Sequence, residues 1–108
     1  HALANTGIGV EILLDSSIHH DPYTTARLAQ KALGVEADAR IGPLTLKART
    51  HLTEQEFLAK FLGERIIHMG KVIKRRPANA AFAEGWMRRV RDYIVLLPSL
   101  TLTEISEK

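Results

Sequence analysis

Apolar residues recur at three- and four-residue intervals in several separate stretches of the chain, a spacing typical of helices with one buried face. The first stretch predicts a helix over residues 10–20, after an irregular segment over residues 1–9. Its expected buried positions are Val10, Leu13, Leu14 and Ile18.

Capping signals mark the helix that follows. Asp21 is a favourable N-cap and Pro22 suits the first helical position, so we expect a helix to begin there. Gly34 can adopt the left-handed conformation with which helices often end, and this places the last helical residue at Leu33. The positions expected on the buried side of this helix are Ala26, Ala29 and Leu33.

A connector and a brief helix come next. Residues 35–42 show no helical spacing, and Pro43 then begins a short helix that we expect to end near Arg49. Neither this connector nor any other window shows convincing strand alternation.

The next helix has a clear start and an apolar face. Thr53 and Glu56 form a capping box, and the helix should end near residues 74–76, before Pro77. Because Arg65 lies among apolar residues, we expect it to pair with a buried acid or carbonyl. The expected core positions are Phe57, Leu58, Phe61, Leu62, Ile66 and Met69.

The last predicted helix covers residues 79–97 and ends at Pro98. Its apolar stripe comprises Phe82, Trp86, Val90, Tyr93, Ile94 and Leu97, with Trp86 expected in the core. The pattern therefore predicts an all-α fold, a single small domain of four to five helices over residues 1–98, followed by a short polar tail over residues 99–108.

Composition narrows the classes of function. The 108 residues are 45% hydrophobic and 25% charged, as in soluble globular domains, and no apolar run is long enough to span a membrane. Cysteine is absent, which excludes disulfides, thiolate nucleophiles and cysteine-based zinc sites. The chain begins with His1, so we expect it to be a processed product or a fragment.

Polar side chains gather where the first two predicted helices meet. They are Asp15, Ser16, His19, His20 and Tyr23. Asp15 and His19 share a helical face, an arrangement that suits an ordinary ion pair, an acid–base couple, half of a metal site or the polar wall of a binding groove. Since no third ligand is evident, we expect no metal and no cofactor. If a groove is present, these five side chains are the ones expected to contact its ligand.

Positive charge is the second candidate signal. The net charge of +3 mildly favours anionic partners without implying nucleic acid. The clustered cations suit a helix C-terminus or a solvated face as well as a polyanion-binding patch. They are Lys71, Lys74, Arg75, Arg76, Arg88, Arg89 and Arg91.

Residues 24–35 have the residue types of the first half of a helix-turn-helix motif. That motif joins its helices by a turn of about three or four residues. Here residues 36–42 separate the two predicted helices, a connection that is too long, so nucleic acid is not an expected partner.

The order of several sequence pieces resembles a bacterial and phage family. The pieces are L-L-D-S-S-I-H-H-D, A-R-L-A-Q-K-A-L-G-V-E-A-D-A-R-I-G-P-L-T-L, G-E-R and F-A-E-G-W-M-R-R-V, within residues 7–91. With them the chain is similar to the C-terminal half of the lysozyme-like muramidases of glycoside hydrolase family 108, the secretion-activator proteins. The segments 41–46 and 85–90 are the most specific.

This resemblance implies an all-helical, lysozyme-like accessory half that is described as a predicted peptidoglycan-binding domain. The family's catalytic Glu lies in a Glu-Gly-Gly motif of its N-terminal half, and this chain lacks that motif. We therefore expect no catalytic residue here and no catalysis by this chain alone. Two features depart from the family: His19 and Asp21 stand where it has Asn and Gly, and Ala39 stands where it has Gly. Without that Gly, the turn after Asp38 is expected to avoid a positive φ.

The expected function is a peptidoglycan-binding domain of a bacterial or phage cell-wall muramidase, located in the periplasm or cell envelope, or in the cytoplasm before export if it derives from a phage. Its expected partners are glycan strands or stem peptides of peptidoglycan and the N-terminal catalytic half of the same protein. The alternative is a helical protein-interaction module that forms a homodimer, and the third interpretation is helix-turn-helix-like DNA binding.

Overall fold

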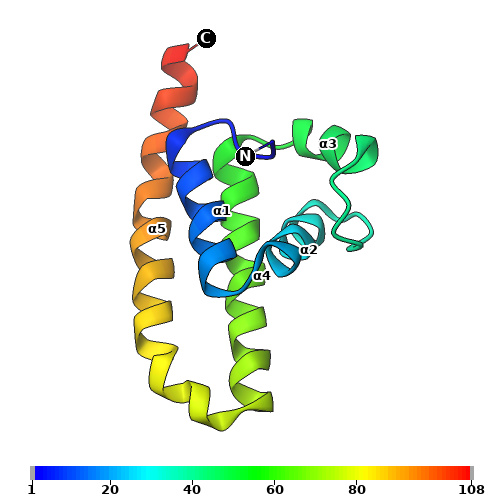
Figure 1. Ribbon diagram of the computed structural model, residues 1–108. Coiled ribbons are helices and arrows are strands. Elements are labelled where there is room, and N and C mark those ends of the chain that lie inside the picture. Colours follow the sequence, from blue (N-terminus) through cyan, green and yellow to red (C-terminus); the bar gives the residue numbers. More distant parts are fainter. Residues whose placement is uncertain (1, 108) are drawn as a thin grey trace.

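A computed structural model describes residues 2–107, with side chains described for residues 2–100, and it contains helices and no strand over that range. The elements are α1 Gly7–His19, α2 Pro22–Leu33, α3 Pro43–Thr50, α4 Glu54–Arg75, the 3-10 helix η1 Pro77–Asn79, and α5 Ala80–Glu107. The long helices α4 and α5 lie side by side in opposite directions, α1 packs along them, and α2 crosses α4 (Figure 1). The expected all-α fold is confirmed.

Helix α1 begins earlier than the sequence predicted. Thr6 is its N-cap, and the Thr6 hydroxyl accepts a hydrogen bond from the Gly9 amide at 2.9 Å, so the expected irregular segment ends three residues sooner. The predicted buried face is also wrong in part, because Leu14 is 51% exposed and Ile18 is 81% exposed. The buried positions are instead Gly9, Ile12, Leu13, Asp15 and Ser16.

The capping signals of the next elements are confirmed. Asp21 caps α2, and Gly34 ends it in the left-handed region with φ of 73°. At the start of α4, Thr53 and Glu56 exchange the two hydrogen bonds of a capping box. Ile66 was expected in the core but lies at the surface of α4, where it is 37% exposed.

The connector between α2 and α3 is held by the fully buried Gln30. Its Nε2 donates to Asp38 Oδ1 and to the Arg40 carbonyl, each at 2.9 Å, and its Oε1 accepts from the Ala39 amide at 2.8 Å. These contacts bend the backbone so that Ala39 has φ of 65°. The expectation that this turn avoids a positive φ is therefore wrong.

Helix α5 continues past Pro98 to Glu107, so the predicted helix end at Pro98 is also wrong. Pro98 cannot donate to the carbonyl of Ile94, which costs one helical hydrogen bond. Leu97 and Leu100 are 5% and 2% exposed, and their burial on either side of the proline favours continuation. The division of the chain into a domain and a polar tail after residue 98 stays a prediction.

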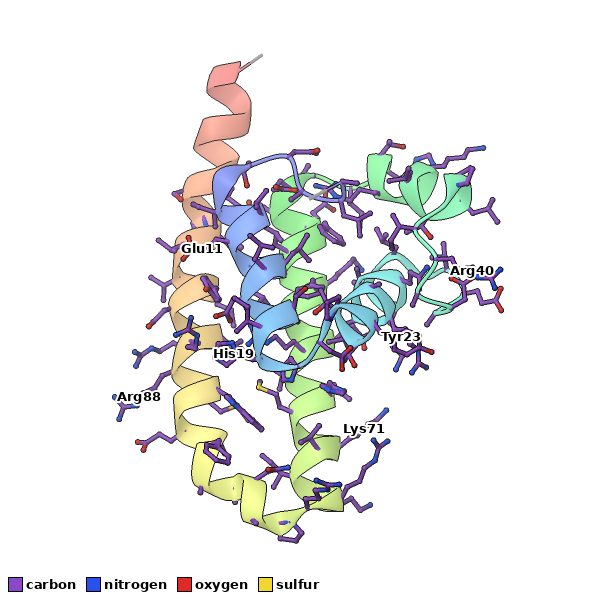
Figure 2. All side chains as sticks on the ribbon, in the orientation of Figure 1. Glu11, His19, Tyr23, Arg40, Lys71 and Arg88 are labelled. Carbon is purple, nitrogen blue, oxygen red and sulfur yellow. The ribbon has the colours of Figure 1, made fainter. Side chains whose placement is uncertain are left out.

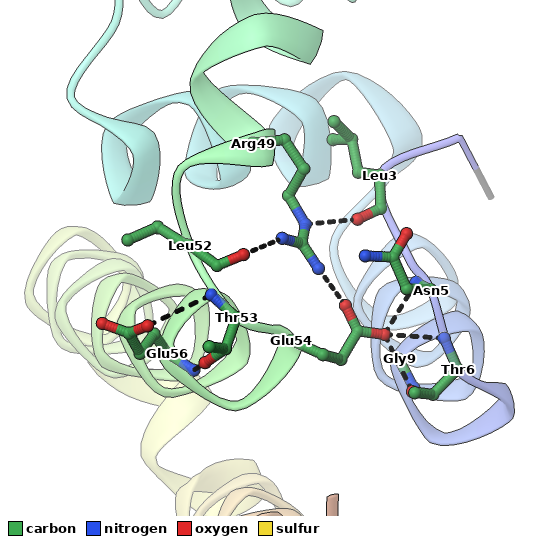
Figure 3. A network of polar contacts seen from close by, with 9 residues as sticks. All are labelled: Leu3, Asn5, Thr6, Gly9, Arg49, Leu52, Thr53, Glu54 and Glu56. Atoms are coloured by element: carbon green, nitrogen blue, oxygen red, sulfur yellow. Dashed lines mark hydrogen bonds and ion pairs between the residues drawn. The ribbon is translucent and has the colours of Figure 1, made fainter. Parts of the chain in front are cut away.

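The N-terminal segment is anchored to the α3–α4 junction through the buried Glu54 (Figure 3). Glu54 Oε1 accepts from Arg49, and Glu54 Oε2 accepts from the backbone amides of Asn5 and Thr6, each at 2.8 Å. Arg49 Nε in turn donates to the Leu3 carbonyl at 2.7 Å. These bonds place Leu3 in the core and fix the start of α1.

Candidate functional site

Asp15 lies in a buried ionic cluster that joins α1, α4 and α5. Its Oδ2 lies 2.9 Å from Arg65 Nη1, and its Oδ1 accepts from Arg89 Nε at 2.9 Å. Burial alone would raise the pKa of the Asp15 carboxyl, but the hydrogen bond from Arg89 and the ion pair with Arg65 together lower it below its ordinary value. Asp15 is thus an ionised carboxylate, and the expected pairing of Arg65 with a buried acid is confirmed.

Ser16 and Tyr23 lie in opposite environments. Ser16 is fully buried and its Oγ accepts a hydrogen bond from the Thr25 hydroxyl at 2.9 Å, which ties α1 to α2. Tyr23 is 62% exposed on α2 (Figure 2). The structure therefore does not bring all five predicted ligand contacts to one surface, since Asp15 and Ser16 face the interior.

His19 and His20 lie where α1 approaches α4 and α5. His19 Nδ1 is 2.8 Å from the Asp15 carbonyl oxygen and 3.3 Å from Asp15 Oδ1. The His20 Nε2 accepts from Arg65 Nε at 3.3 Å. Burial, followed by the positive charge of Arg65, lowers the pKa of His20 to about 4, so its imidazole is neutral at neutral pH and suits the acceptor role.

An aromatic pocket of about 460 Å³ opens beside His19. Its lining residues are His19, Ala81, Phe82, Gly85, Trp86 and Arg89. The rings of Phe82 and Trp86 are stacked, with centroids 6.1 Å apart and an angle of 24° between their planes. Phe82 is 59% exposed and Trp86 is half-buried, so Trp86 lies at the edge of the core and not in its centre as expected.

This pocket combines two kinds of chemistry. Aromatic faces pack against the apolar C–H faces of ligands, and an arginine fork binds carboxylates. Arg89 is 50% exposed while its guanidinium is bonded to Asp15, so one side of the cation is fixed and the other faces solvent. The sequence predicted Trp86 in the core and left Arg89 open between a solvated face and a polyanion-binding patch. It could not show their meeting with His19, which depends on how α1 packs against α5.

Two further concavities flank the helices. An apolar groove of about 340 Å³ lies between α1 and α5, with Leu14, Ile18 and Tyr93 in its lining. A basic pocket of about 320 Å³ lies between α2 and α4. The basic pocket is lined by Thr24, Arg27, Leu28, Lys31, His68, Lys71 and Arg75.

The segments that carry the resemblance most specifically also line pockets. Gly42, Pro43, Leu44 and Thr45 border a pocket of about 300 Å³ beside the connector. Gly85, Trp86 and Arg89 border the aromatic pocket. A Cβ atom added to Gly85 would meet nothing within 4 Å, so this glycine does not serve close helix packing and leaves the pocket wall open.

Within the described residues, no three His, Asp or Glu side chains are grouped so that they could hold a metal ion. A search of the same part of the chain finds no helix with the length and apolar character needed to cross a membrane.

Comparison with known proteins identifies the family. The family described as Predicted Peptidoglycan domain matches residues 24–91, more than half of the chain. The chain belongs to this family. The matched region of the predicted peptidoglycan domain includes α2 from its third residue onward, α3, α4, the first part of α5, the basic pocket and the aromatic residues Phe82 and Trp86.

A solved structure described as "Structure of Brucella abortus SagA" is similar to this predicted peptidoglycan domain. The two share 26% sequence identity and superpose with a TM-score of 0.69, over 85% of this chain and 51% of that chain. The domain thus spans about half the length of that solved chain. No curated protein matches it. The family match confirms the expected peptidoglycan-related domain, and the structural match confirms its helical architecture.

Proposed function

We propose that this domain binds peptidoglycan as the accessory half of a cell-wall muramidase of glycoside hydrolase family 108, in the periplasm or cell envelope. The observation that carries the proposal is the aromatic pocket within a member of the predicted peptidoglycan domain family. The match to about half of a longer solved chain supports an N-terminal catalytic half as its partner.

The aromatic pocket suits an acidic amino sugar. A pyranose ring presents an apolar face that can stack on Phe82 and Trp86, whose rings are already parallel to within 24°. Stem peptides carry carboxylates, as does muramic acid where no peptide is attached to it, and the exposed side of Arg89 can bind such a group. Because Asp15 already orients the Arg89 guanidinium, little side-chain entropy is lost when a ligand binds.

The remaining predicted contacts take different parts in this proposal. His19 lines the aromatic pocket and can contact the ligand directly. Asp15 and Ser16 do not contact the ligand but hold α1 in place against the neighbouring helices. His20 packs against the inner side of Trp86, with ring centroids 6.0 Å apart. Tyr23 stays a proposed contact on the neighbouring exposed face of α2.

Retention on purified peptidoglycan sacculi tests the proposal. The wild-type chain should sediment with sacculi, and Phe82→Ala should reduce the retained fraction several-fold because one face of the stacking pair is lost. Val95→Ala is the matched control, since Val95 is 70% exposed on the same helix and does not line the pocket. Equal retention of the two variants, or no retention of the wild type above an unrelated protein, would contradict the proposal.

A second pair of variants tests the charge. Arg89→Gln should weaken retention, whereas Arg88→Gln should not, because Arg88 points away from the pocket and pairs with Glu84 (Figure 2). The two variants have the same net charge, so a difference between them reports the position of the cation. Bond cleavage is not proposed for this chain alone, and clearing of a turbid cell-wall suspension by it would contradict that assignment.

The apolar groove supports a second candidate function, a homodimeric interaction module. Leu14 and Ile18 expose large apolar side chains beside this groove, and such surfaces often pack against another protein. Light scattering distinguishes the two functions. A stable dimer that Ile18→Glu converts to a monomer would favour the interaction module, and a monomeric wild type would reject it.

A further inference from the structure

The basic pocket between α2 and α4 is a second site that the aromatic pocket does not include. Arg27 and Lys31 are one helical turn apart on α2, and Lys71 and Arg75 are one turn apart on α4. The two pairs face a common hollow of about 320 Å³. The hollow lies in the lower half of α4, where Lys71 is seen in Figure 2.

The cations of this pocket form no ion pair within the part of the chain whose side chains are described. The nearby Asp21 is engaged as the N-cap of α2, where it accepts from the Thr24 amide and hydroxyl. Like charges one helical turn apart repel each other, so a bound anion would relieve a cost that the folded chain otherwise carries.

His68 reports the electrostatic character of the hollow. Burial lowers the pKa of His68, and the charges of Lys31, Arg75 and Lys71 lower it further, while the charge of Asp21 acts in the opposite direction. The pocket is therefore a region of positive potential that a neutral imidazole lines at neutral pH. Leu28 adds an apolar contact to its wall.

A row of rings connects the basic pocket to the aromatic pocket. His68 lines the basic pocket and its ring lies 4.9 Å from that of His20, edge to face. The His20 ring is 6.0 Å from that of Trp86, which lines the aromatic pocket. His20 therefore lies between a ring that lines the basic pocket and a ring that lines the aromatic pocket.

We propose that the basic pocket lined by Arg27, Lys31, Lys71 and Arg75 binds the carboxylate groups of a peptidoglycan stem peptide whose sugar lies in the aromatic pocket. The inference rests on the function proposed above and deepens it, because it assigns the glycan and the peptide of one ligand to two neighbouring pockets. A single nucleic-acid strand would require aromatic rings interleaved with the cations, and no ring other than His68 lines this hollow.

Titration calorimetry with two soluble probes tests the assignment. One probe is the N-acetylglucosamine–N-acetylmuramic acid disaccharide with a stem tripeptide. The other is the same disaccharide with its lactyl carboxyl capped as a simple amide in place of the peptide. The wild-type chain should bind the peptide-bearing probe more tightly by about tenfold, the gain expected for charge-assisted hydrogen bonds to the peptide carboxylates. The double variant Lys71→Gln/Arg75→Gln should lose this gain and keep its affinity for the peptide-free probe.

The matched control is Lys74→Gln/Arg76→Gln, which removes the same charge near the same end of α4 without touching the pocket lining. It should leave both affinities unchanged. Equal binding of both probes by the wild type, or equal losses in the two double variants, would overturn the inference while leaving peptidoglycan binding in place. Failure of the wild type to bind either probe or sacculi would overturn the proposed function as well.

Two competing ligands, inorganic phosphate and duplex DNA, test whether the basic pocket binds carboxylates or another kind of anion. Displacement of the peptide-bearing probe by millimolar inorganic phosphate would identify a phosphate site and overturn the assignment to carboxylates. Binding of duplex DNA that depends on Lys71 and Arg75 in a gel shift would overturn it in favour of nucleic acid. Persistence of probe binding in the presence of both competitors would support the stem-peptide assignment.

Discussion

Arg65 Nη1 lies 2.9 Å from Asp15 Oδ2, and this contact between α4 and α1 takes place where neither side chain is more than 5% exposed. The contact is an ion pair without the angle of a hydrogen bond, and Arg65 Nη2 has no hydrogen-bond partner among the described residues. Arg89 completes the cluster from α5. One carboxylate therefore pairs with two cations from different helices.

The first prediction concerns this buried pair. Arg65→Leu should lower the free energy of unfolding by about 3 kcal/mol, because the Asp15 carboxylate loses its buried partner. The double variant Arg65→Leu/Asp15→Leu should recover part of that loss, since it leaves no unpaired charge in the interior. Urea denaturation of wild type, both single variants and the double variant measures the coupling, and strict additivity would contradict it.

The second prediction concerns the close approach of α1 to Glu54. A Cβ atom at Gly9 would collide with the Glu54 carboxylate, which cannot move because Arg49, Asn5 and Thr6 all bond to it. Gly9→Ala should therefore destabilise the fold by about 2 kcal/mol. Gly63→Ala in α4 is the control, because nothing lies within 4 Å of its added Cβ, and it should stabilise the chain by about 0.5 kcal/mol. Thermal denaturation of the two variants should show shifts of opposite sign.

The third prediction concerns Ala39, whose φ of 65° is unfavourable for a residue with a side chain. Ala39→Gly should raise the free energy of unfolding by about 0.5 kcal/mol, the balance between relieved strain and the greater freedom of glycine in the unfolded chain. Ala37→Gly has no positive φ to relieve and should destabilise. A lower melting temperature for Ala39→Gly would show that the turn is not strained.

The fourth prediction concerns pH. The pKa of His20 is about 4 in the folded chain and has its ordinary value of 6.5 in the unfolded chain. Between these two pH values, the unfolded chain therefore binds a proton that the folded chain does not. The stability that His20 contributes is fully present above pH 6.5 and is lost as the pH falls towards 4. The loss should be about 2 kcal/mol after allowance for solvent screening, with His68 acting in the same direction.

Denaturant titrations at several pH values across this window test the effect. His20→Gln should flatten the dependence of the unfolding free energy on pH above pH 4, because it removes the imidazole whose pKa is lowered by folding. Because the pKa of Asp15 is lowered from its ordinary value of 3.8, this carboxyl changes the unfolding free energy only below about pH 3.8. It therefore does not contribute to the pH dependence in the range where His20 titrates. An unchanged slope in His20→Gln would contradict the assignment.

Local signals in the sequence were sufficient for most of the helices. The Asp21-Pro22 start, the Gly34 end and the Thr53–Glu56 capping box all act within one helical turn, so they could be identified from neighbouring residues alone. The errors occurred where distant contacts decide the local geometry. Gln30 bends the connector at Ala39, and core burial of Leu97 and Leu100 carries α5 past Pro98.

The candidate site was predicted only in part for a related reason. His19 and His20 were found because they are adjacent in a polar stretch. Phe82, Trp86 and Arg89 lie more than sixty residues away, and Arg89 is joined to Asp15 across that separation. No local pattern indicates which face of α5 meets α1.

The sequence by itself determined the helical class, the starts of α2, α3 and α4, the need of Arg65 for a buried partner and the resemblance to a peptidoglycan domain, because periodicity, capping and motif order are properties of neighbouring residues. Only the tertiary structure decided that Asp15 and Ser16 face the interior, that Leu14 and Ile18 face solvent, and that His20 separates an aromatic pocket from a basic one. Each of these depends on the rotation of one helix against another, which is set by packing across the core and not by spacing along the chain.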